Sequence, residues 1–78
     1  MNPRIEKAEY LPSKKLKIVF KNGECKIFDF SSYLKFPVYQ PLANDTLCRQ
    51  VKVINGTVCW NEDIDFDPDR VYLESVPL

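Results

Sequence analysis

The chain contains the dipeptide Asn-Gly twice, and each copy lies between two runs of alternating apolar and polar residues. This arrangement is a strong sign of a β-hairpin, because Asn and Gly both tolerate the positive φ that a type I′ turn requires. The first copy is Asn22-Gly23. A two-residue loop there predicts Phe20 opposite Cys25 and Ile18 opposite Ile27, with all four side chains on one face of the pair.

The second copy is Asn55-Gly56. The same two-residue loop pairs Val53 with Val58 and Val51 with Trp60, and we expect these four apolar side chains to face the core. The opposite face would carry Lys52, Ile54, Thr57 and Cys59.

Helix signals are short. Ser31 is a candidate N-cap for one helical turn that ends before Phe36-Pro37, because the residue before a proline disfavours the α region. Residues 39–43 are expected to be irregular, and Asn44 or Asp45 is expected to cap another single turn.

A further helix is predicted near the C-terminus. Asp67 followed by Pro68 is a helix start, with the Asp67 side chain accepting backbone N–H groups and the proline in the first turn. Alternation over residues 5–11 predicts a first strand. The sequence therefore predicts one α+β domain over residues 1–78, with a small, mostly antiparallel sheet of about five strands and one or two short helices, one at the C-terminus.

Composition places the chain among ordinary globular proteins of a reducing compartment. Cys25, Cys48 and Cys59 are an odd number of dispersed thiols, and no run approaches the ~20 apolar residues of a membrane span, so we expect a cytoplasmic protein. The net charge of zero conceals an asymmetry. Residues 1–39 hold eight Lys/Arg and four Asp/Glu, a balance of +4, whereas residues 40–78 hold three and seven, a balance of −4.

The sequence lacks the residues that several kinds of catalytic and binding site require. Histidine is absent, which removes His-based triads and zinc sites, and both glycines belong to hairpin turns, which leaves none for a phosphate-binding loop. We therefore expect no enzymatic activity, no catalytic residues, no cofactor and no dedicated metal site. Weak binding of Mg²⁺ or Ca²⁺ by Asp63, Asp65 and Asp67 is an open alternative to their being solvated or capping residues.

A binding surface is expected on the outward side of the first hairpin. The register predicted above places Lys17, Val19, Lys26 and Phe28 there. If the helices leave Val19 and Phe28 uncovered, they form an apolar patch among lysines, which favours a protein partner. Two alternatives stay open. The lysines would protect a sheet edge from aggregation, or the face would bind nucleic acid, with the aromatic ring stacking on a base.

Three short motifs follow one another along nearly the whole chain. They are Phe20-Lys21-Asn22-Gly23 with Asp29, then Pro41-Leu42 leading to Asn55-Gly56 and Trp60, then Asp63-Ile64-Asp65 and Asp67-Pro68-Asp69 leading to Tyr72. Their order resembles a family of small bacterial proteins known as domain-of-unknown-function family 2442. Residues 61–62 are Asn-Glu, where that family often has proline or glycine.

The resemblance implies an α+β meander with a C-terminal helix in a bacterial, cytoplasmic protein. It also implies a gene that often lies beside that of another small protein, as in a toxin–antitoxin pair. No catalytic residues come with the family. The resulting hypothesis is a non-enzymatic interaction module, antitoxin-like or partner-binding, in a two-protein system.

Overall fold

The computed structural model describes residues 2–61 and 63–78. Three strands are followed by three short helices, three more strands, one helix and a final strand, and two of the helices are 3₁₀ helices, η1 and η2. In chain order the elements are β1 (Ile5–Leu11), β2 (Lys15–Phe20), β3 (Cys25–Asp29), η1 (Ser31–Lys35), η2 (Pro37–Ala43), α1 (Asp45–Cys48), β4 (Lys52–Ile54), β5 (Thr57–Asn61), β6 (Ile64–Phe66), α2 (Pro68–Glu74) and β7 (Val76–Pro77).

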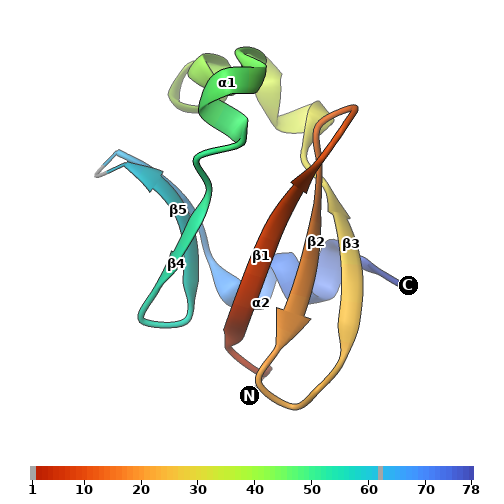
Figure 1. The fold of residues 1–78 in the computed structure, drawn as a ribbon. Coiled ribbons are helices and arrows are strands. Elements are labelled where there is room, and N and C mark those ends of the chain that lie inside the picture. The colour runs from red at the N-terminus through yellow and green to blue at the C-terminus, as the bar shows by residue number, and fades with distance from the viewer. Residues whose placement is uncertain (1, 62) are drawn as a thin grey trace.

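The strands form two antiparallel sheets, which confirms the α+β class. The first sheet has the order β1-β2-β3-β7 and the second has the order β4-β5-β6. In Figure 1, α2 lies behind the first sheet, while α1 and the 3₁₀ helices cover its upper end. The two strands beyond the expected five are β6 and β7, which have three and two residues. Runs this short carry too little alternation to be recognised in a sequence.

The core between the two sheets is aromatic. Phe66 of β6 is at its centre, because its ring stacks on Tyr39 at 4.5 Å between centroids and meets the ring of Phe28 edge-on at 5.1 Å. Phe30 and Trp60 pack around the same ring, at 6.2 and 5.8 Å. Aromatic pairs in such geometries add about 0.5–1.5 kcal/mol each beyond the burial of their surface. A few large rings thus supply much of the core of a small domain.

The β4–β5 hairpin has the expected register. Val53 pairs with Val58, and both Asn55 and Gly56 have positive φ, at 54° and 78°. Val58 and Trp60 are buried. The inward face of this hairpin is therefore confirmed.

The β2–β3 hairpin differs from the prediction by one residue. Val19 pairs with Cys25, because the loop spans three residues: the Phe20 N–H donates to the Glu24 carbonyl and the Gly23 N–H to the Phe20 carbonyl. Of the Asn22-Gly23 pair, Gly23 alone has positive φ. This is the geometry of a turn completed by a glycine bulge, the usual alternative to a two-residue loop.

The shifted register turns the residues of β3 over. Cys25 and Ile27, expected inside, lie on the outer side, while Lys26 and Phe28 point inward. Phe28 and Phe30 share a parity and both are buried. Each buried Phe side chain contributes about 1.5–3 kcal/mol. Burying two rings outweighs burying Cys25 and Ile27, and this selects the three-residue loop.

Helix starts follow the predicted signals in part. The Asn44 side chain accepts the backbone N–H groups of Thr46 and Leu47, so it is the cap of α1. The expectation that residues 39–43 are irregular is wrong, because prolines with fixed φ and i→i+3 bonds such as Asn44 N–H to the Pro41 carbonyl form η2 there. Asp67 precedes α2, but its side chain accepts no backbone bond; burial of Pro68 and Val71 holds that helix instead.

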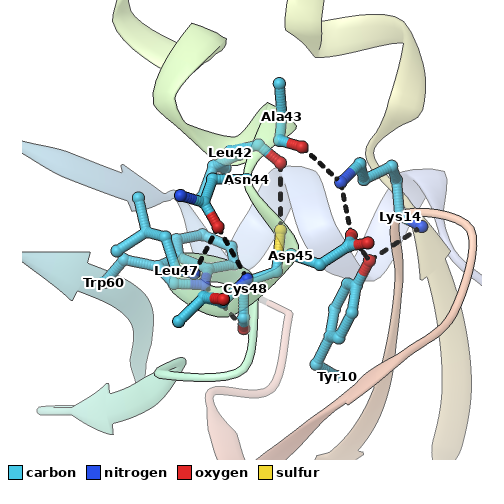
Figure 2. Close-up of polar contacts among 10 residues, drawn as sticks. Tyr10, Lys14, Leu42, Ala43, Asn44, Asp45, Leu47, Cys48 and Trp60 are labelled. Atoms are coloured by element: carbon cyan, nitrogen blue, oxygen red, sulfur yellow. Dashed lines mark hydrogen bonds and ion pairs between the residues drawn. The ribbon is translucent and has the colours of Figure 1, made fainter.

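A polar cluster ties the β1–β2 turn to α1 (Figure 2). The Lys14 ammonium lies 2.6 Å from Asp45 Oδ1 and 3.0 Å from the Ala43 carbonyl, and the Tyr10 hydroxyl donates to the same Asp45 oxygen at 2.8 Å. Nearby, the Trp60 indole N–H donates to the Cys48 carbonyl at 3.0 Å. Hydrogen bonding to Lys14 holds the pKa of Asp45 below its usual value. These contacts fix α1 to both sheets, and they engage the Lys14 ammonium in bonds within the domain.

Candidate protein-interaction surface

The outer side of the first sheet is not covered by any helix or strand of the described chain (Figure 1). Its other side packs on α2, where the rings of Phe20 and Tyr72 meet edge-on at 5.0 Å and Val71 is buried. We call the outer side the open face. From β1 through β7 it is made of Lys7, Glu9, Leu11, Lys15, Lys17, Val19, Cys25, Ile27, Asp29 and Val76.

An apolar stripe runs across the open face. Val19 pairs with Cys25 across β2 and β3, and Ile27 pairs with Val76 across β3 and β7. The backbone N–H of Leu78 donates to the Cys25 carbonyl at 3.1 Å, which continues the stripe. Val76 is 60% exposed and Leu78 is 71% exposed. The stripe comprises Val19, Cys25, Ile27, Val76 and Leu78.

Lysines flank the stripe on the side toward β1. Lys7 pairs with Val19, and Lys17 pairs with Ile27. The ion pairs within 4 Å in residues 2–61 and 63–78 are Lys14 with Asp45 and Arg70 with Glu74, so the open-face lysines have no carboxylate at that distance. At the end of β3, the Ser31 backbone N–H donates to Asp29 and holds the pKa of Asp29 below its usual value.

Two of the four residues predicted to bind a partner lie on this surface. Lys17 and Val19 are on the open face, as expected. Phe28 is not, because the shifted register buries it against Phe66. Lys26 also turns inward, where its ammonium lies 3.7 Å from the centroid of the Tyr72 ring and 3.1 Å from the Tyr72 carbonyl. The expectation that these two side chains point outward is wrong.

Sequence reasoning missed the other half of the stripe. Cys25 and Ile27 were assigned to the core by the two-residue loop. A signal was present, since extending the alternation of β3 by two positions brings in Phe30 and places two Phe rings on the face opposite Cys25 and Ile27. Val76 belongs to the stripe because it lies in β7, a two-residue strand that no sequence pattern predicts.

A shallow groove adjoins the stripe. It has a volume of about 520 Å³ and is lined by Glu6, Lys7, Ala8 and Glu9 of β1, Lys17 and Val19 of β2, and Val53 of β4. Since it shares Lys17 and Val19 with the open face, the two form one continuous surface.

A family comparison matches residues 5–77 to the family described as "Protein of unknown function (DUF2442)". The chain belongs to this family. The match covers the three motifs that carry the resemblance and confirms it. Among the curated proteins and the solved structures, none matches the chain. Membership in DUF2442 identifies the family of the chain, and the description of that family assigns no function.

The described carboxylates of this DUF2442 chain do not converge. Asp65 lies on the outer side of β6 and Asp67 precedes α2, with Asp63 before β6. Within residues 2–61 and 63–78, no group of three or more Cys, Asp or Glu side chains is arranged to hold a metal ion. Burial raises the pKa of the Cys48 thiol, whose Sγ donates to the Leu42 carbonyl at 3.0 Å, so this cysteine acts as a core residue.

No helix in the described chain combines the length and the apolarity needed to cross a membrane. The described residues also leave no buried side-chain nitrogen or oxygen without a hydrogen-bond partner. The buried side-chain nitrogen and oxygen atoms of these residues are thus used in contacts within the fold.

Proposed function

We propose that this domain is a non-catalytic protein-binding module that acts in the cytoplasm, and that its open face binds the partner. The observation that supports this proposal most strongly is the apolar stripe beside lysines that, among the described residues, have no carboxylate within 4 Å. Contiguous apolar surface that no other part of a domain covers marks interaction sites in soluble proteins. A sheet face of a small domain can supply a large part of the ~800 Å² per partner that a stable complex buries.

The chemistry of the face defines the partner. An apolar centre that fits the stripe, with carboxylates along one side to meet Lys7, Lys15 and Lys17, would complement it. Nucleic acid is less well supported, because Phe28 is buried and the open face of the described chain then offers no aromatic ring on which a base could stack.

The contacts of the titratable side chains support a non-catalytic role. The shifted pKa values belong to side chains that hold the fold, such as Asp29 with Ser31 and Lys14 with Asp45. Strongly shifted groups in a cleft would instead suggest a catalytic site. The further proposal of an antitoxin-like role in a two-protein system is supported by the gene neighbourhood that the family resemblance implies.

The test is affinity capture with the tagged domain from nuclease-treated extracts of cells that carry its gene. The variants are Val76→Glu on the open face and Ile54→Glu on the second sheet. Ile54→Glu is the matched control for Val76→Glu, since Val76 and Ile54 are 60% and 51% exposed and both lie in strands. We expect a partner that wild type and Ile54→Glu retain, and that Val76→Glu binds about tenfold more weakly or not at all.

Equal recovery by all three proteins would place the interface elsewhere. Failure to recover any partner would contradict the proposed function. Capture from untreated extracts that is lost after nuclease treatment and weakens steeply with salt would favour nucleic acid instead.

A further inference from the structure

No helix or strand of the described residues covers the outer side of the second sheet either, and its chemistry differs from that of the open face. The β4–β5 hairpin forms one edge of the molecule in Figure 1, with no helix beyond it. An open groove of about 540 Å³ lies on this side. We call it the second face; its lining residues are Lys52, Ile54, Asn55, Thr57, Cys59, Asn61 and Asp65.

One row across the second face has opposite charges at its two ends. Lys52 of β4 pairs with Cys59 of β5, and Cys59 pairs in turn with Asp65 of β6. The neighbours of these residues along each strand, such as Val58 and Ile64, are buried, which places the row on the outer side. Adjacent strands lie about 4.8 Å apart, so Lys52 and Asp65 are separated by about 10 Å with the thiol between them.

Among the described residues, neither charge has an ion-pair partner. Lys52 and Asp65 are both exposed. Neither belongs to either of the two ion pairs within 4 Å in the part of the chain that the structure describes. Two solvated, opposite charges at fixed positions on a sheet favour one orientation of a partner that carries complementary charges.

A twofold axis parallel to β5 makes this row complementary to itself. Rotation by 180° about such an axis turns the second face of one copy onto that of another and exchanges the two ends of the row. Lys52 of each copy then lies opposite Asp65 of the other, and the two Cys59 residues lie opposite each other. An axis perpendicular to the strands would instead set lysine against lysine, so the charges select one orientation.

We infer that the second face binds a second copy of this chain, in a symmetric dimer held by two reciprocal Lys52–Asp65 pairs around Cys59. Self-complementarity of this kind is what a twofold interface requires. Sheets stacked with their strands nearly aligned are a common packing of two β-layers. Ile54, 51% exposed beside the row, adds apolar surface.

The dimer forms in a concentration-dependent way, because three short strands present less surface than a permanent interface buries. It is independent of the proposed partner site, which lies on the other sheet. The inference and the proposed function can therefore fail separately: variants of the second face change self-association, and variants of the open face change partner capture.

The test is sedimentation equilibrium of the purified full chain over a wide concentration range at low salt. Lys52→Asp and Asp65→Lys each replace two attractive contacts by two repulsive ones, so we expect each to weaken dimerisation about tenfold or more. The double variant Lys52→Asp/Asp65→Lys restores the opposite charges and should dimerise like wild type. Lys17→Asp, on the open face, serves as the control and should leave dimerisation unchanged.

Cross-linking provides a second readout. In a Cys25→Ser/Cys48→Ser background, a short thiol–thiol cross-linker should give a covalent dimer through Cys59, since stacked sheets lie about 10 Å apart. Adding Asp65→Lys should abolish this product. A wild type that stays monomeric at all concentrations, a double variant that fails to restore the dimer, or cross-linking that is insensitive to Asp65→Lys would overturn the inference.

Discussion

In the β4–β5 hairpin both Asn55 and Gly56 have positive φ, whereas in the β2–β3 hairpin Gly23 alone of the pair does. The first arrangement closes a two-residue loop and the second a three-residue loop. The same dipeptide therefore supports two turns whose registers differ by one residue. A shift of one residue exchanges the two faces of a strand, so the choice of turn decides which side chains reach solvent.

The apolar residues on each face of the strands determine which of the two turns forms. In β5 a single face, through Val58 and Trp60, is strongly apolar, and the two-residue loop buries it. In β3 both faces carry apolar residues. The face that continues to Phe30 is the buried one, because its burial removes two aromatic rings from solvent. Turn chemistry alone thus predicts a hairpin, while the volume available to each face predicts its register.

The largest expected effect tests which face of β3 is buried. Phe28→Ala should destabilise the domain by about 3–5 kcal/mol, since it leaves a cavity against Phe66, whereas Ile27→Ala on the open face should cost about 1 kcal/mol. Urea unfolding measures both. Phe28→Leu is the milder variant if Phe28→Ala does not fold. A larger loss for Ile27→Ala than for Phe28→Ala would support the two-residue register.

The next effect separates the two glycines. A Cβ at Gly56 would lie 2.6 Å from Arg4 Nε and 2.8 Å from Arg4 Cβ, whereas a Cβ at Gly23 meets no atom within 4 Å. Both have positive φ, so Gly23→Ala should cost about 1–2 kcal/mol from backbone strain alone. Gly56→Ala should cost about 3 kcal/mol or more because of the added clash. Equal losses in thermal unfolding would argue against the close packing of Arg4 on this turn.

The smallest effect concerns the two asparagines. Asn22 accepts the Glu24 N–H at 3.0 Å and donates to the Glu24 carboxylate at 2.6 Å, so Asn22→Gly should destabilise by about 0.5–1 kcal/mol. Asn55 has a φ of 54°, which glycine adopts without cost, so Asn55→Gly should be neutral or slightly stabilising. Differential scanning calorimetry of the two variants checks the order. Destabilisation by Asn55→Gly alone would contradict the assignment of the turns.

Much of the fold was predictable because its strongest signals are local. Strand β1, the cap at Asn44 and the start of α2 at Pro68 follow from alternation, a capping side chain and a proline. Strand β6 was not, because its three residues carry too little alternation and pair with β5 across an irregular register. Strand β7 was not, because its two residues form a strand by pairing with β3, which lies far earlier in the chain. Such pairing is a property of tertiary structure, which local pattern does not contain.

The site was predictable in its location but not in its membership. Lys17 and Val19 come from β2, whose parity is unambiguous because every second residue is buried. The shift of the β2–β3 register by one residue places Cys25 and Ile27 on the open face instead of Lys26 and Phe28. The open face therefore kept its basic side and lost its expected aromatic ring, which changes the kind of partner that it fits.

The register of the β2–β3 hairpin is the central claim, because the composition of the open face depends on it. Nuclear Overhauser contacts between Hα protons measure it directly, since these protons approach closely in the non-hydrogen-bonded pairs of an antiparallel ladder. The Phe20 N–H bond to the Glu24 carbonyl makes Val19–Cys25 and Lys17–Ile27 such pairs. We expect strong Hα–Hα contacts between Val19 and Cys25 and between Lys17 and Ile27. Contacts between Phe20 and Cys25, or between Ile18 and Ile27, would contradict the account.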